Sequence, residues 1–433
     1  DNVSTSSGSL GLDVDNNSTV TSLTVGHTTP VSIASGRTLS GAITVTAGSI
    51  KLDEAGTLAS TVSMSRGTIL DADESMTISG SLTQSGSFNT NQGWTIDVAV
   101  GKTLTYTGAA IGIEGHKLIL TSSSSNGGAT FNNTNPLLLN NANSYLRFDA
   151  EVTVGSVSVN VAGNSGRGLK IKQSSTIGSL TVTANTELSI YSGKSLSGAI
   201  TVSAGSLKLN ETGTLASTIA MSGGTLDADE TSTVSGALTQ GGNITIDVAD
   251  GKILTYSGAA LSVGANMLTL SGGGSLVSGG LTLNNASSKL LLNSITVDNV
   301  STTVDNSLGV DVDNDSTITS LSVANITPVS IASGKTLSGA ITLTAGSIKL
   351  DETGTLASTV EMSGGTLDAD ESLTISGALT QSGDTTIDVL DNKTLTYSGA
   401  PLSLGANTLT MSGGGTFYNS YNLTLSAESI LKL

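Results

Sequence analysis

The chain has 433 residues, of which 37% are hydrophobic, 12% charged and 3% aromatic, and its formal net charge is −17 at pH 7. This charge argues against a nucleic acid as a partner, because binding to phosphates needs clustered Lys and Arg side chains. The absence of cysteine excludes disulfide bonds, and no apolar run reaches the roughly 18 residues of a transmembrane helix. The hydrophobic fraction and the regular pattern also exclude a disordered chain.

The sequence consists of three long repeats, which we interpret as one continuous domain over residues 1–433 because a repeat protein extends a single core. They are repeat 1 (1–157), repeat 2 (158–297) and repeat 3 (298–433). Repeat 1 is longer, since it contains two polar, glycine-containing insertions at 87–93 and 121–136. We expect both insertions to form loops.

In each repeat, short segments alternate between apolar and polar residues and end at a glycine-containing turn. In repeat 3 such segments begin at Val329, Ile348, Leu367 and Ile387, at spacings of 19, 19 and 20 residues. Alternation with a period of two predicts short, half-buried β-strands. Almost no helix is expected, because we find no sustained apolar stripe with the helical period.

This spacing is compatible with two all-β architectures, a β-solenoid and an array of β-sandwiches. We favour the solenoid because successive segments resemble one another position by position, as in SIKLDE, TLDADE and TIDVLD. The predicted fold is therefore a single elongated all-β solenoid with rungs of about 20 residues. A right-handed parallel β-helix is preferred, because crossover connections between parallel strands are right-handed.

Acidic residues that recur in every repeat are the candidates for metal binding. In stacked rungs Asp370 would lie above Asp351 and Glu371 above Glu352, about 4.8 Å apart. Like charges repel at that distance, and Ca²⁺, which binds oxygen ligands, could neutralise them. A solvated edge screened by counter-ions is the alternative. The candidate calcium ligands are Asp351, Glu352, Asp368, Asp370 and Glu371 in repeat 3 and Asp53, Glu54, Asp71, Asp73, Glu74, Asp227, Asp229 and Glu230 in the other repeats.

A second acidic pattern is interpreted differently. Asp311 and Asp313 of repeat 3 are replaced by Lys170 and Lys172 at the matching positions of repeat 2. A metal site would not survive two charge reversals, so we expect these side chains to face solvent from a strand.

No catalytic residues are predicted, and we expect no enzymatic activity. Neither a nucleophile elbow nor a zinc-protease or phosphate-loop motif occurs. Tyr106, Tyr256 and Tyr397 occupy the same place in each repeat and share the parity of the preceding leucine, so we expect them to point inward or to lie at a corner. Trp94 is expected to pack in the core.

The segments GANMLTLSGGGS (264–275), GANTLTMSGGGT (405–416) and SGGTLDAD (222–229 and 363–370) resemble the repeats of bacterial autotransporter passengers and filamentous-haemagglutinin-like adhesins. The resemblance implies a secreted right-handed β-helix and a role in surface display, adhesion or matrix building. It implies no particular binding residues.

We therefore expect a non-enzymatic, extracellular bacterial structural protein at the cell surface, either the stalk of a large adhesin or the protomer of a head-to-tail filament or sheath. The repeats run to both ends of the chain, so we expect either a longer native chain or an end-to-end homopolymer. The alternative is a calcium-stiffened adhesin that binds a glycan or host surface through the loops of repeat 1. A polysaccharide-active β-helix enzyme comes third.

Overall fold

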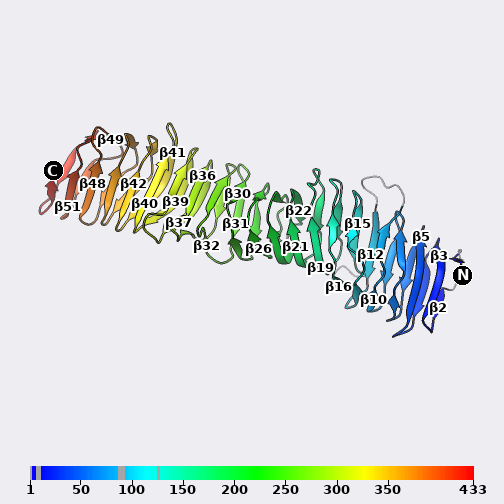
Figure 1. Cartoon of the computed structure of the whole chain (residues 1–433). Coiled ribbons are helices and arrows are strands. Elements are labelled where there is room, and N and C mark those ends of the chain that lie inside the picture. The colour runs from blue at the N-terminus through cyan, green and yellow to red at the C-terminus, as the bar shows by residue number, and fades with distance from the viewer. Residues whose placement is uncertain (1, 6–10, 86–92, 124–126) are drawn as a thin grey trace. The chain divides into compact units, whose positions relative to one another are not determined.

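The computed structural model describes residues 2–5, 11–85, 93–123 and 127–433. All the regular elements in this part of the chain are β-strands, and they form a parallel β-solenoid of about 20 turns with roughly 21 residues per turn. The predicted all-β solenoid is confirmed, and its right-handedness stays a prediction. The chain divides into two compact units, residues 1–220 (unit 1) and 221–433 (unit 2), in each of which parallel strands lie side by side (Figure 1).

Each turn contributes strands to two sheets. In unit 2, β41 (Thr336–Leu343) lies in the first sheet and β42 (Ser347–Leu350) in the second. In the next turn two short strands, β43 (Thr355–Leu356) and β44 (Thr359–Met362), replace the long one, and β45 (Thr366–Ala369) follows in the second sheet. The same plan in unit 1 uses β5 (Thr38–Val45), β6 (Ser49–Leu52), β7 (Thr57–Leu58), β8 (Thr61–Met64) and β9 (Ile69–Ala72).

The core is a set of columns in which apolar side chains of successive turns stack on one another. Ile348, Leu367 and Ile387 are Cα partners on β42, β45 and β48 (Thr385–Val389), and all three are buried. Val329 of β40 (Ile326–Ile331) is also buried, but Ile348 pairs with Thr327 instead. The 19-residue spacing between the starts of these two segments is therefore not the register spacing, which is 21 residues at this step. A shift by two residues leaves every side chain on its own face, so the alternation cannot reveal it.

A glycine-dependent bulge recurs where two long strands pair. Between β39 (Ser316–Val323) and β41 the register shifts after Ile318, opposite Gly339. Gly339 has a φ of +120°, and a Cβ atom at this position would lie 1.7 Å from the carbonyl oxygen of Ile318. Only glycine fits so close an approach of two backbones. Gly41 and Gly198 stand at the same bulge in unit 1, with φ values of +121° and +123°.

The recurring tyrosines are buried, as their parity predicts, and they join adjacent turns. The hydroxyl of Tyr106 accepts a hydrogen bond from the backbone N–H of Leu82 at 3.1 Å and donates one to the carbonyl of Ala109 at 2.6 Å. Tyr397 repeats the first of these contacts with Leu379 at 3.0 Å. Each hydroxyl thus supplies the acceptor for a buried N–H, which is costly to leave unpaired. Trp94 packs in the core as expected.

The two predicted loops of repeat 1 fall partly outside the described residues, which omit 86–92 and 124–126. In the described part of the second insertion, the loop prediction is wrong for β16 (Ala129–Asn133), which pairs in parallel with β13 (Thr103–Tyr106). Ala129 and Phe131 are buried on the core side of that strand. Their alternation with polar residues was the signal of a strand, and the serine- and asparagine-rich flanks obscured it.

Candidate functional site

The predicted acidic residues lie on the second sheet and in the turns that follow its strands. Asp71 on β9, Asp227 on β27 (Thr225–Ala228) and Asp368 on β45 occupy equivalent half-buried outward positions. Their neighbours Asp73 and Asp370 come directly after the strands. These aspartates therefore point outward, and the side chains that they contact in adjacent turns determine their role.

Lysines from adjacent turns pair with these acidic side chains. The Nζ of Lys51 lies 2.7 Å from Asp73, and Lys349 makes the same ion pair with Asp370. These hydrogen bonds raise the pKa of both Lys51 and Lys349 above the usual value. The glutamate of the LDADE motif is paired one turn further on in all three repeats, in the ion pairs Lys102–Glu74 (2.6 Å), Lys252–Glu230 (2.6 Å) and Lys393–Glu371 (2.5 Å).

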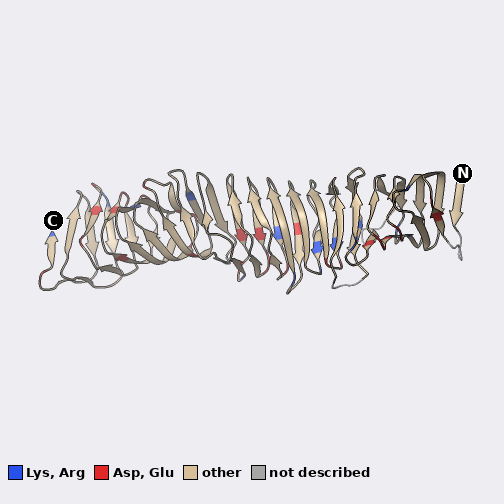
Figure 2. Ribbon diagram, turned by 90° about the horizontal axis from the view of Figure 1, so that it is seen from below, with Lys and Arg blue, Asp and Glu red and all other residues tan. Residues whose placement is uncertain are grey.

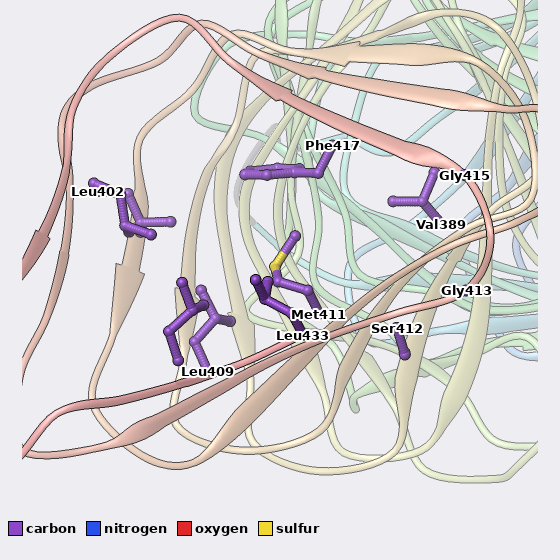
Figure 3. Close-up of a pocket in the computed structure, with 11 residues that line it drawn as sticks. Val389, Leu402, Leu409, Met411, Ser412, Gly413, Gly415, Phe417 and Leu433 are labelled. Atoms are coloured by element: carbon purple, nitrogen blue, oxygen red, sulfur yellow. The ribbon is translucent and has the colours of Figure 1, made fainter.

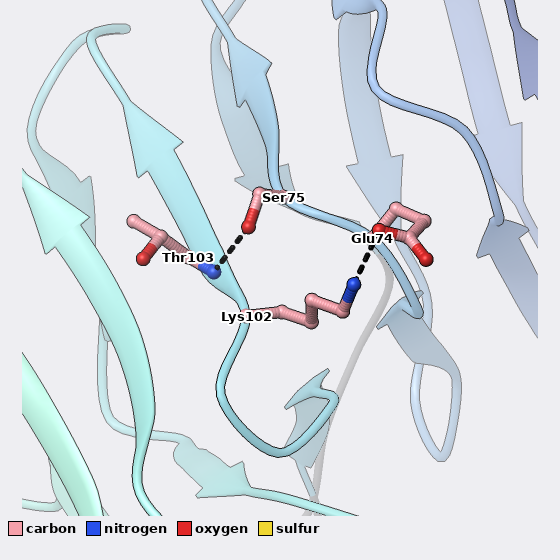
Figure 4. Close-up of polar contacts among 4 residues, drawn as sticks. All are labelled: Glu74, Ser75, Lys102 and Thr103. Atoms are coloured by element: carbon pink, nitrogen blue, oxygen red, sulfur yellow. Dashed lines mark hydrogen bonds and ion pairs between the residues drawn. The ribbon is translucent and has the colours of Figure 1, made fainter.

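A backbone contact accompanies each of these glutamate pairs. Next to the Glu74–Lys102 pair, the Oγ of Ser75 accepts a hydrogen bond from the backbone N–H of Thr103 at 3.1 Å (Figure 4). In repeat 3, Ser372 accepts the equivalent bond from Thr394 at 3.0 Å. The partly exposed ion pairs contribute only about 0–1 kcal/mol each. Together with the backbone contact, they favour one alignment of adjacent turns over others.

The acidic column one turn earlier is also held by hydrogen bonds between turns. Ser32 donates to Asp53 at 2.7 Å, and Ser330 donates to Asp351 at 2.6 Å. In repeat 2 the acceptor is Asn210, which takes the same bond from Ser189 at 2.7 Å. In repeat 2 a neutral amide oxygen replaces the carboxylate oxygen. In all three repeats the side chain at this position therefore accepts a hydrogen bond from a serine of the adjacent turn. Glu54 and Glu352 are exposed.

Aspartate pairs that we did not predict form the third feature of this region. Asp71 faces Asp97 of β12 (Gly93–Val98), and Asp368 faces Asp388 of β48. Burial, followed by the nearby charges of Asp73 and Asp97, raises the pKa of Asp71 to about 6, against the opposing effect of Lys51. Burial also raises the pKa of Asp97 and of Asp368. The recurring TIDV segment was the available signal, since its aspartate has the same outward parity.

These contacts determine how far the structure supports a calcium site. In the described ranges, no group of three or more His, Cys, Asp or Glu side chains could hold a metal ion. Lysines and serines from neighbouring turns bind three of the four carboxylates that we expected to repel one another, Asp351, Asp370 and Glu371, whereas Glu352 is exposed. Calcium binding therefore stays a prediction, and the arrangement seen here connects turns of the solenoid.

A cavity of about 370 Å³ lies among the last turns of unit 2 (Figure 3). Leu402, Leu409, Met411 and Phe417 line it, and among the described residues around it only Ser412 carries a polar side chain. The lining continues the apolar columns of the core, so the cavity offers hydrophobic surface and no set of converging polar groups.

None of the described residues belongs to a helix that could span a lipid bilayer. No protein-family model matches the chain, and comparisons with curated proteins and with solved structures likewise found no match.

Proposed function

We propose that the chain is a non-enzymatic structural protein that bacteria display outside the cell, as the stalk of a large adhesin or as the protomer of a surface filament. The observation that carries this proposal is the use of the recurring polar residues. In all three repeats the glutamate–lysine pair and the tyrosine hydroxyl connect one turn of the solenoid to the next. These recurring side chains hold adjacent turns together, and this supports a mechanical role for the solenoid.

The proposal includes how the chain would be assembled. A solenoid extends by adding turns, so the chain would act either within a longer polypeptide or by end-to-end association with other copies. In both arrangements the stalk or filament would consist of stacked solenoid turns.

Immunogold electron microscopy of the native cells tests the proposal. Gold label along fibres or stalks outside the cell envelope is the expected result. Label confined to the cytoplasm, or to globular particles without fibres, would contradict it. The location of the label does not depend on any bound ligand.

A further inference from the structure

One face of unit 1 departs from the acidic character of the chain. Five cations and two tyrosines gather on four neighbouring strands of the second sheet, namely β15 (Lys117–Thr121), β18 (Tyr145–Phe148), β20 (Gly168–Ile171) and β22 (Thr186–Ile190), or directly beside them. Figure 2 shows basic positions interspersed with acidic ones along the strands. We call this group the basic patch, and it consists of Lys117, Arg147, Arg167, Lys170, Lys172, Tyr145 and Tyr191.

The patch is an ordered arrangement of partly exposed side chains. Arg147 and Lys170 are Cα partners on adjacent strands, and Lys117 is the partner of Tyr145. The guanidinium of Arg167 lies 6.0 Å from the centre of the Tyr145 ring, and Nζ of Lys170 lies 5.7 Å from that of Tyr191. Cation–π contacts of this kind hold the long side chains in place over the sheet.

Two acidic residues offset only part of this charge. Asp149 forms ion pairs with Arg147 and, at 3.4 Å, with Lys172. Glu187 accepts hydrogen bonds from the N–H of Gly166 and from the amide of Asn210. Five positive against two negative side chains leave a local excess of three positive charges, in a chain whose net charge is −17. Burial and the nearby Arg147 lower the pKa of Lys117, which is the direction expected where cations crowd together.

The solenoid does not require these cations. In unit 2 the equivalent pair of strands is β36 (Lys289–Asn293) and β38 (Gly309–Val312), where Leu291 is the Cα partner of Asp311. There Lys289 forms an attractive ion pair with Asp311. The facing cations Arg147 and Lys170 of unit 1 instead repel each other, and like charges opposite one another destabilise a sheet. The facing pair of Arg147 and Lys170, which unit 2 replaces by Leu291 and Asp311, points to a function outside the core.

From this geometry we propose that the basic patch binds an extended polysaccharide that bears carboxylate groups. The adjacent strands that carry the facing residues Arg147 and Lys170 lie about 4.8 Å apart, which is close to the length of one sugar residue in such a chain. Guanidinium and ammonium groups bind carboxylates through charge-assisted hydrogen bonds. Duplex DNA carries a charge every ~1.7 Å of its axis, a far denser pattern than this patch presents. The partly exposed rings of Tyr145 and Tyr191 add surface for sugar faces.

Calorimetric titration of the full chain with polygalacturonate at low salt tests the proposal. The patch variant combines Arg147→Leu with Lys170→Asp, which places the residues of unit 2 at the same register positions. A matched variant, Lys335→Asp with Lys432→Leu, makes the same change in net charge in unit 2. We expect the patch variant to bind at least about tenfold more weakly, and the matched variant to bind as the unmodified chain does. If the patch variant has a lowered melting temperature, the single variant Lys170→Gln replaces it, and we expect its loss of affinity to be intermediate.

Further titrants separate the possible ligands. Neutral dextran should not bind, and heparin, double-stranded DNA and phosphatidylserine vesicles should all bind more weakly than polygalacturonate. Equal binding by the two variants, or no binding of polygalacturonate at low salt, would overturn the proposal. Tighter binding of heparin, DNA or vesicles through the same residues would also overturn it, because the ligand would then be a sulfated polymer, a nucleic acid or a membrane.

Discussion

At the scale of single residues, the facing aspartate pairs are an unfavourable contact that recurs in the solenoid. Asp71 and Asp97 face each other on adjacent strands, half-buried, with Lys51 as the nearest compensating charge. Two ionised carboxylates in this position repel each other and lose hydration. Protonation of one relieves both effects, which is why the pKa of Asp71 rises to about 6.

This shift predicts a dependence of stability on pH in unit 1. The ordinary pKa of the Asp71 carboxyl is 3.8, and in the folded chain it is about 6. Between these values the folded state binds more protons than the unfolded state, so the contribution of Asp71 to stability is lost as the pH rises through this window. We expect Asp71→Asn to raise the melting temperature above pH 6, with a gain that shrinks toward pH 3.8.

Thermal melting followed by circular dichroism at several pH values measures this effect. Asp250→Asn, in an exposed turn of unit 2, is the control and should change the melting temperature little at any pH. A gain from Asp71→Asn that is the same at both ends of the pH window would show that repulsion at Asp71 is not its cause.

At the scale of the strands, the bulge glycines set how closely two long strands approach. Gly339 and Gly334 both have positive φ, but an added Cβ would strike the backbone only at Gly339 and would meet nothing within 4 Å at Gly334. An alanine at Gly334 therefore introduces backbone strain alone, whereas an alanine at Gly339 adds a steric clash with the neighbouring strand.

Replacing each glycine by alanine tests this distinction. Gly334→Ala should cost about 1–2 kcal/mol, the strain of a left-handed conformation. Gly339→Ala should cost about 4 kcal/mol or more, because β39 and β41 must move apart. Denaturant unfolding of both variants measures the difference. Similar losses at the two positions would mean that the bulge tolerates a side chain.

The strands also show how much of the fold the sequence could predict. Leu367 and Ala369 alternate with Asp368 and Asp370, and this local parity was enough to assign inside and outside correctly. The register was less accessible, since Ile348 pairs with Thr327 and a shift by two residues preserves the parity. The lengths and conformations of the turns determine the register, and the alternation of apolar and polar residues does not predict them.

The candidate site was harder to predict for a related reason. Lys349 and Asp368 were visible at equivalent places in successive segments, yet the partner that Lys349 takes is Asp370. A long side chain on a sheet reaches several neighbours, and the sequence does not say which of them it contacts. The pairing of Asp71 with Asp97 depends instead on the strand register, which the alternation does not fix. The sequence correctly predicted that the side chains of Asp311 and Asp313, and of Lys170 and Lys172 at the matching positions, point outward. It did not reveal that Arg147 and Tyr145 lie on the strand next to Lys170.

At the scale of the whole molecule, acidic residues outnumber basic ones by 34 to 17. The recurring carboxylates are nonetheless engaged by lysines and serines of adjacent turns, as at Glu371 and Asp351. We therefore expect removal of divalent cations with EDTA to leave the melting temperature unchanged. A melting temperature that falls on chelation and recovers with Ca²⁺ would contradict this expectation and support the calcium-stiffened alternative.

The central claim is that consecutive turns lie directly over one another in parallel register. Thr77 of β10 (Met76–Ile78) and Thr105 of β13 are outward Cα partners on adjacent turns. The chain contains no cysteine, so a pair introduced as Thr77→Cys and Thr105→Cys can be joined without competition by a short bifunctional thiol reagent. Adjacent strands lie about 4.8 Å apart, so parallel stacking predicts rapid cross-linking of this pair. The control pairs Thr77→Cys with Thr103→Cys, two residues away from the Cα partner, and it should cross-link slowly. Equal rates, or faster reaction of the displaced pair, would contradict the stacked parallel register.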